Sequence, residues 1–181
     1  MFDKIINNPI LKDGPPDWYY KTKTPTADLF SNLFFIIPAY SAFRYNYPTL
    51  GLSILLAMLG SMWFHTKLTP NSLYIDRLGM ILAYSVFINI LYPSIPIIMF
   101  FSVGFILLEL SKKINNQIPY MFFQFLMFAL FSFKQSVVYK SRLYIILFII
   151  GNVLQSFDIR YFHALKHIFF SIALDGLLKS I

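Results

Sequence analysis

The chain has 181 residues, of which 57% are hydrophobic and only 13% are charged, and its formal net charge is +7. This apolar fraction exceeds what one soluble domain needs to fill its core, so the composition argues against an ordinary soluble globular protein. The lack of cysteine excludes disulfides, thiolate metal sites and cysteine nucleophiles. Lys and Arg stand singly or in pairs between apolar runs, which is typical of membrane flanks and not of nucleic-acid binding.

The first 26 residues are polar, are interrupted by proline, and lack the apolar core of a cleavable signal peptide. We therefore predict a polar tail over 1–26 and a seven-helix transmembrane domain over 27–181. Backbone groups in hydrocarbon must be paired internally, so apolar stretches of about 20 residues indicate membrane-spanning helices. Seven stretches follow the tail, at 27–45, 48–68, 72–91, 97–110, 119–133, 143–154 and 161–178.

Proline and lysine mark the ends of these stretches. Pro48 occupies the favoured first position of the second helix, and Pro70 with Asn71 is predicted to turn the chain before the third. Pro93 ends the third helix, and Lys112 stops the fourth. The predicted fold class is an all-α integral membrane bundle of seven transmembrane helices.

An odd number of spans places the two termini on opposite sides of the membrane. The basic residues divide ten to five in favour of the N-terminal side, which by the positive-inside tendency faces the cytoplasm. The ten are Lys4, Lys12, Lys21, Lys23, Lys67, Arg77, Lys112, Lys113, Arg160 and Lys166, and the five are Arg44, Lys134, Lys140, Arg142 and Lys179.

All three histidines are predicted at the N-terminal side of the bundle. His163 and His167 are four residues apart at the start of the seventh helix, so they share one face. His65 lies near the end of the second helix, and Ser61 precedes it by four residues. Asp76 follows about one turn into the third helix and lies at the same depth. Five polar residues from three helices can therefore meet.

Ionisable residues within a membrane helix cost several kcal/mol unless they find partners or a cavity. Three neutral imidazoles with water in the fourth position form a recurrent catalytic zinc site, in which the cation lowers the pKa of that water toward about 7. Asp76 would then accept the water's proton, and Ser61 would donate to the oxyanion at an attacked carbonyl. The residues alone leave a second interpretation open, in which the histidines lie at the membrane interface among headgroups.

Other polar residues of the apolar stretches have simpler interpretations. Asn32 and Ser31 are predicted to form hydrogen bonds between helices. Glu109 is interpreted as an interfacial acid in preference to a partner of the metal site. Asp175 is predicted to pair with Lys179 or to reach the interface.

The segments GSMWFHTKL, YIDRLGM and FHALKH together resemble the alkaline ceramidases, and more widely the superfamily that joins them to the progestin and adiponectin receptor-like membrane proteins. In that family a serine and a histidine four apart end the second helix, an aspartate follows the turn, and a His-x3-His pair opens the seventh. The resemblance implies zinc held by His65, His163 and His167, with Ser61 and Asp76 assisting hydrolysis. It also implies a ceramide-like lipid substrate, cleaved to a sphingoid base and a fatty acid, and a location in the endoplasmic reticulum or Golgi membrane.

The chain departs from the family pattern in two places. Arg77 stands where an acidic residue often follows the family's aspartate. The family's N-terminal calcium site begins with Asp-Trp, and Asp17 and Trp18 are retained, but residues 19–21 are aromatic and basic where further acids are expected. Since calcium needs six to eight oxygen ligands, this segment argues against a calcium site.

Three other functions are alternatives to lipid hydrolysis. A receptor-like or scaffold membrane protein with a structural metal site remains open. A transporter would have paired broken helices with matching Gly or Pro interruptions, which the two halves lack. A retinal-type photoreceptor would need a lysine deep in the last helix, whereas Lys166 is predicted at its mouth.

Overall fold

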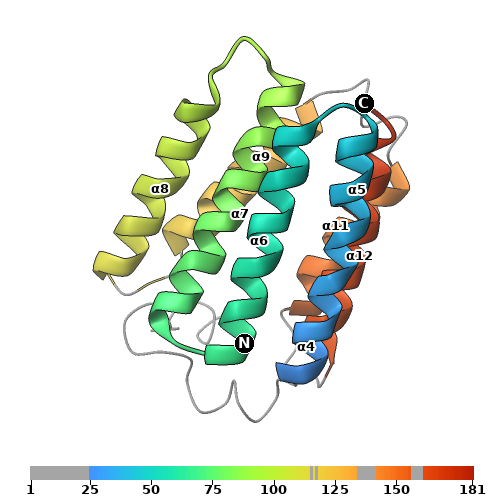
Figure 1. The fold of residues 1–181 in the computed structure, drawn as a ribbon. Helices are drawn as coiled ribbons and strands as arrows, with labels where there is room; N and C mark the ends of the chain where they lie inside the picture. Colours follow the sequence, from blue (N-terminus) through green and yellow to red (C-terminus); the bar gives the residue numbers. More distant parts are fainter. Residues whose placement is uncertain (1–24, 115, 117, 134–141, 156–160) are drawn as a thin grey trace.

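The computed structural model describes residues 25–114, 116, 118–133, 142–155 and 161–181, and within these ranges the chain is helical without strands. The helices of the described residues form seven rods (Figure 1). The first rod comprises α4 (Pro25–Asn32), the 3-10 segment η1 (Leu33–Phe35) and α5 (Ile36–Arg44). The others are α6 (Pro48–Lys67), α7 (Pro70–Leu91), α8 (Ile97–Ile114), α9 (Ile118–Phe133), α11 (Arg142–Gln155) and α12 (Phe162–Leu178). The predicted all-α fold and helix order are therefore confirmed. Of the predicted polar tail over 1–26, residues 1–24 lie outside the described residues.

The turn between α6 and α7 lies earlier than predicted. Leu68 ends α6 in the left-handed conformation with φ 50°, and Thr69 caps α7. The Thr69 hydroxyl accepts from the Ser72 N–H at 3.2 Å, and the Ser72 hydroxyl accepts from the Thr69 N–H at 3.0 Å. Pro70 and Asn71 therefore begin the helix and are not part of the turn, because a missing N–H costs nothing at the first helical position.

Two glycines allow α6 and α7 to approach backbone to backbone. A Cβ atom placed on Gly79 would lie 2.7 Å from the Cα of Ala57, and one on Gly60 would lie 3.3 Å from the Cα of Asp76. Small residues at helix interfaces permit such close approach. The packing sets Ser61, the neighbour of Gly60, against the turn of α7 that carries Asp76.

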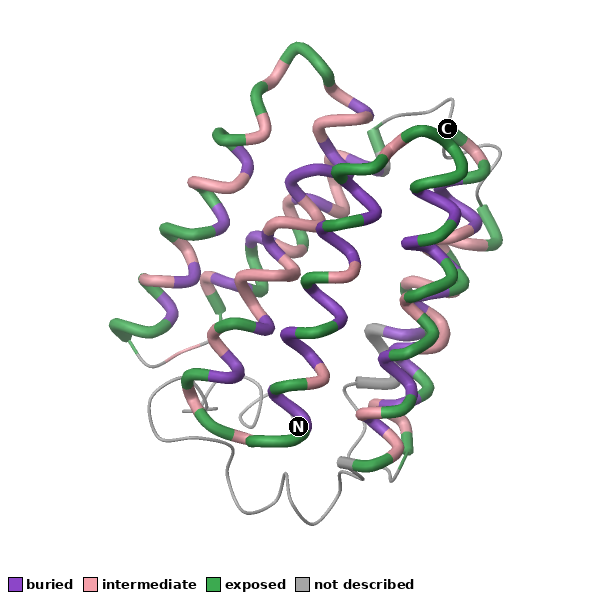
Figure 2. Tube along the Cα trace, viewed as in Figure 1, coloured by how far each residue is buried: buried purple, intermediate pink, exposed green. Residues whose placement is uncertain are grey.

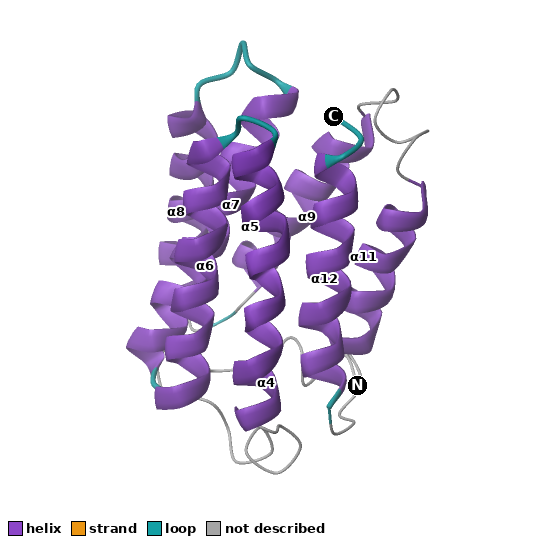
Figure 3. Cartoon of the chain, turned by 45° about the vertical axis from the view of Figure 1, so that its right-hand side comes forward, coloured by secondary structure: helices purple, strands orange, loops and turns teal. Residues whose placement is uncertain are grey.

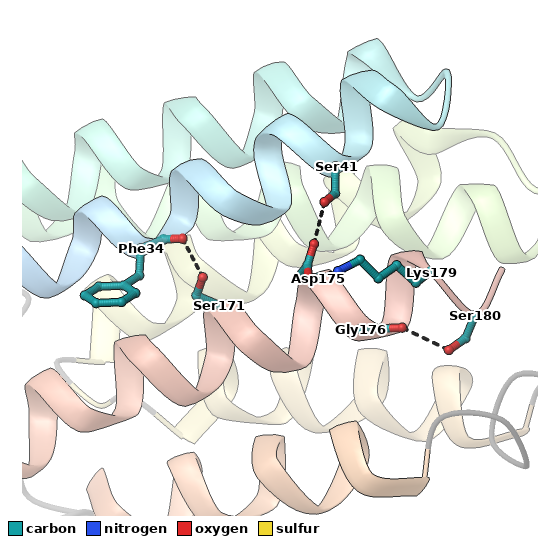
Figure 4. Close-up of polar contacts among 7 residues, drawn as sticks. All are labelled: Phe34, Ser41, Ser171, Asp175, Gly176, Lys179 and Ser180. Atoms are coloured by element: carbon teal, nitrogen blue, oxygen red, sulfur yellow. Dashed lines mark hydrogen bonds and ion pairs between the residues drawn. The ribbon is translucent and has the colours of Figure 1, made fainter.

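The first rod changes from α-helix to 3-10 helix because of Pro38. In a regular α-helix the carbonyl of Phe34 would accept from the N–H of residue 38, which proline lacks, and the proline ring crowds that carbonyl. Ser171 of α12 supplies a donor instead, at 2.5 Å from the Phe34 oxygen (Figure 4). Closer to the C-terminal end of α5, Ser41 donates to the Asp175 carboxylate (Figure 4). The first rod packs between α6 and α12 (Figure 3).

Buried residues lie where the rods meet, and many outward faces are apolar and exposed (Figure 2). On α6, for example, four large apolar side chains recur every three or four residues and are 46–56% exposed: Leu52, Leu56, Leu59 and Trp63. Within the described ranges, α6 and α7 are long and apolar enough to cross a membrane. Length and composition alone also admit a core helix of a soluble protein.

Candidate metal centre

Three histidines meet at one end of the bundle, between the last turn of α6 and the start of α12. The ring centroid of His65 lies 5.1 Å from that of His163 and 5.4 Å from that of His167, and the two α12 rings are 4.6 Å apart. His65 and His167 are buried, whereas His163 is partly exposed. The helix bundle thus brings together all three histidines predicted to share a site.

The donor set of this cluster fits a metal ion. One ring nitrogen from each histidine lies within 4.8 Å of the other two. In a tetrahedral zinc site, with bonds of about 2.0–2.1 Å, ligand nitrogens lie about 3.3 Å apart, so modest ring rotations would close the site. Imidazole nitrogen also suits copper, iron and nickel, and the cluster therefore indicates a metal site without identifying the metal.

The first rod contributes two side chains to this cluster that sequence patterns did not assign to it. Asp28 is fully buried, and its Oδ2 lies 3.8 Å from Nδ1 of His65. Ser31 is also buried, and its Oγ lies 2.9 Å from Nδ1 of His167. The sequence does carry a signal for this placement. A serine stands three residues after an acid, in the first turns of an apolar stretch that begins on the side of the histidines.

The predicted hydrogen bonds of Ser31 and Asn32 have different outcomes. Ser31 does bridge two helices, through its contact with His167. Asn32 instead donates to the backbone carbonyl of Asp28 at 2.8 Å, within its own helix. The expectation of an interhelical bond is therefore confirmed for Ser31, while the hydrogen bond described for Asn32 is local.

Asp76 and Ser61, the proposed base and oxyanion donor, are in contact with one another. Asp76 is buried, and the Ser61 hydroxyl is placed to donate to its carboxylate. Arg77 places its guanidinium 3.8 Å from Oδ2 of Asp76. Lys166, only 7% exposed, is a further cationic neighbour of Asp76, and it belongs to the same turn of α12 as His163 and His167. Lys166 therefore lies near the start of α12, as predicted from the sequence, but its side chain is buried in the bundle.

Arg77, the departure from the family pattern, also faces the interior. Its guanidinium lies 4.9 Å from the ring centroid of Tyr120 on α9, a cation–π distance. The Tyr120 hydroxyl in turn accepts from Gln124 at 3.2 Å. Arg77 thus ties Asp76 to a third helix beyond the pair of α6 and α7.

The remaining acids of the described helices have partners of their own. Glu109 accepts a hydrogen bond from the Tyr74 hydroxyl. Asp175 pairs with Lys179 at 2.5 Å, as predicted, and also accepts from Ser41. The residues considered for calcium, Asp17 and Trp18, lie outside the described residues.

Comparison with known proteins adds no assignment to this geometry. No family model matches the chain, and no curated protein matches it.

Proposed function

We propose that the seven rods cross a lipid bilayer and that the histidine cluster forms the zinc site of an intramembrane amide hydrolase acting on ceramide-like lipids. The membrane part is supported by the outward apolar faces. Large exposed apolar side chains occur on rods besides α6, with Ile98 and Ile106 of α8 at 65% and 62% exposure and Phe125 of α9 at 67%. Contiguous apolar surface of this kind is unfavourable in water and favourable against lipid.

The observation that supports hydrolysis most directly is the meeting of His65, His163 and His167, with Ser61 and Asp76 paired on the neighbouring helices. Three imidazoles leave a fourth coordination position open, which is the feature that separates catalytic from structural zinc sites. When bound, zinc would supply a water of lowered pKa and a Lewis acid for a carbonyl oxygen.

The residues of the chain would handle the proton in this reaction. In amide hydrolysis the water oxygen bonds to the carbonyl carbon, and the carbon–nitrogen bond breaks to give a carboxylic acid and an amine. Asp76 accepts the proton of the attacking water and returns it to the leaving nitrogen. Ser61 has one hydroxyl hydrogen, which it can donate to the neighbouring Asp76 carboxylate. Once Asp76 has taken up the proton, that hydroxyl is available to the oxyanion.

A receptor-like or scaffold protein with a structural metal is the second candidate function, and the cations around Asp76 favour it. Arg77 and Lys166 both neighbour the carboxylate, as in an ion network that serves structure alone. The two functions differ in turnover, although both require the metal.

The test combines elemental analysis with a release assay on protein purified without chelator. We expect one zinc per chain, together with release of sphingoid base and fatty acid from ceramides, followed by mass spectrometry. Metal content near zero would contradict the site itself. One zinc per chain without turnover on ceramides of varied acyl length would support the receptor-like or scaffold function instead.

A further inference from the structure

The Ser31 hydroxyl makes two contacts that together determine the tautomer of His167. Its Oγ lies 2.9 Å from the Asp28 carbonyl oxygen and 2.9 Å from Nδ1 of His167. A serine hydroxyl has one hydrogen, and a carbonyl oxygen can only accept, so Ser31 donates to Asp28. Both contacts are hydrogen bonds only if His167 carries its proton on Nδ1 and donates it to Ser31. The lone pair of His167 then lies on Nε2.

The Asp28 carboxylate stands in the corresponding place beside His65. Its Oδ2 lies 3.8 Å from Nδ1 of His65, beyond a direct hydrogen bond but within the range of an ion pair. A carboxylate accepts and does not donate, so this neighbour also favours the proton on Nδ1 and the lone pair on Nε2. A rotation of the His65 ring that shortened this distance by about 1 Å would complete a hydrogen bond to Asp28.

We propose that Asp28 and Ser31 are positioning residues, which hold the Nδ1–H groups of His65 and His167 so that Nε2 of each ring is presented to a metal ion. The inference rests on the metal site of the proposed function and is independent of the reaction carried out there. Metal-binding histidines generally donate their second ring N–H to such an acceptor, which fixes the tautomer and makes the ligand more basic. The first helix is thereby part of the metal site although it supplies no ligand.

The test is a zinc competition titration against a chromophoric chelator, performed on the full chain in detergent. Ser31→Ala removes the acceptor for His167, and we expect zinc affinity to fall roughly 10- to 100-fold, the usual cost of losing such a partner. Ser31→Thr keeps a hydroxyl and should restore most of the affinity. For Asp28, the apolar Asp28→Leu should weaken binding more than Asp28→Asn, whose amide oxygen can still accept.

Ser41→Ala is the matched control, because it removes a hydrogen bond between the same two rods away from the histidines (Figure 4). Asp175 keeps Lys179 as its partner in that variant, and zinc affinity should change by less than about twofold. Circular dichroism and gel filtration would verify that each variant is folded. Should Asp28→Leu fail to fold, the Ser31 pair of variants still decides the question.

Cobalt substitution separates a positioning role from direct ligation. The visible spectrum of bound Co2+ reports the number and type of ligands, and it should keep its band pattern in Ser31→Ala and Asp28→Asn. A changed pattern with loss of metal in Asp28→Asn would make Asp28 a ligand and overturn the proposal. Unchanged zinc affinity in Ser31→Ala and Asp28→Leu would also overturn it. An unmutated protein that binds no zinc would instead contradict the metal site.

Discussion

At the scale of single residues, His163 offers the clearest test of metal binding because it is the most exposed of the three histidines. Replacing it with alanine leaves two imidazoles, which under-coordinate a zinc ion. We expect His163→Ala to lose the metal while keeping the helical circular dichroism spectrum of the unmutated protein. Thr66→Ala is a suitable control, since Thr66 is next to His65 but is exposed and donates to the Trp63 carbonyl. Equal metal content in both variants would remove His163 from the site.

Asp76→Asn tests the assignment of the base. The amide is nearly isosteric and still accepts from Ser61, but it cannot take the proton of a water, so metal content should persist while most turnover is lost. Metal analysis and a ceramide release assay on the same preparation would show the separation. Loss of zinc together with activity would make Asp76 a ligand or an orienting residue, and turnover at the unmutated rate would contradict the catalytic assignment.

Ser61→Ala should reduce the rate without removing the metal. Loss of one oxyanion donor typically costs about 100- to 1000-fold in rate, and zinc would still polarise the carbonyl. The measurement is kcat on a ceramide at saturating concentration. Ser53→Ala provides a comparison two turns earlier on α6, where Ser53 donates only to the Leu50 carbonyl, and its rate should stay near that of the unmutated protein.

The histidine cluster was predictable because each member could be placed by counting residues along one helix or from one turn. His163 and His167 share a face by helical periodicity, and His65 and Asp76 were placed at one depth by counting from the turn between their helices. The role of Asp28 was not predictable in this way, because depth does not reveal which helices are neighbours. The buried position of Lys166 depends in the same manner on which helices pack around α12.

At the scale of helices, the pair of α6 and α7 should be sensitive to added volume at Gly79. A Cβ atom there would meet backbone at 2.7 Å, which flexible side chains cannot relieve. We expect Gly79→Ala to lower stability by about 1–3 kcal/mol, the usual cost of overpacking. Thermal unfolding in detergent, with metal content measured alongside, would show whether separation of the helices also disturbs the metal site.

Gly60→Ala is the matched comparison for that prediction. Its Cβ atom would approach the neighbouring backbone only to 3.2 Å, and the better helix propensity of alanine offsets part of the crowding. The variant should therefore be clearly more stable than Gly79→Ala. The reverse order would show that the two helices are not packed as described.

The presence of each helix was predicted from the length of its apolar stretch, but details within the helices depend on local hydrogen bonding. The stretch predicted at 27–45 is one rod, but its middle is 3-10 helix. Pro38 causes this change, and its position in the sequence could have predicted it. Pro70 was assigned to a turn because proline often breaks helices. It begins α7 instead, because Thr69 provides the cap that a first-turn proline requires.

At the scale of the whole molecule, the direction of the rods gives a topological prediction. The start of α4 lies at the histidine end of the bundle, and the C-terminus lies at the opposite end (Figure 1). If the rods cross a membrane, tags at the two termini should be reached from opposite faces of sealed vesicles. Protease protection of each tag, with and without detergent, is the measurement. Accessibility of both tags from one face would contradict seven crossings.

The excess of basic residues at the surface of the N-terminal side is smaller than the sequence alone indicates. Arg77 and Lys166 were counted among the ten basic residues of the N-terminal side, but both face the interior beside Asp76. Without them the division is eight against five, since ten less two is eight. The bias keeps its sign, and a cytoplasmic N-terminal side remains the prediction for the vesicle experiment.

The polar contacts between the first rod and α12 have a consequence for how the protein is made. They join residues 134 to 137 positions apart in the chain. A ribosome completes the first helix long before the last one exists, and polar groups such as the Phe34 carbonyl, whose donor is Ser171 of α12, are costly in hydrocarbon without their partners. On the proposed topology, the nascent first helix must wait at the interface or beside the insertion machinery until α12 arrives. Chains that stop before α12 should therefore be early substrates for membrane quality-control proteases.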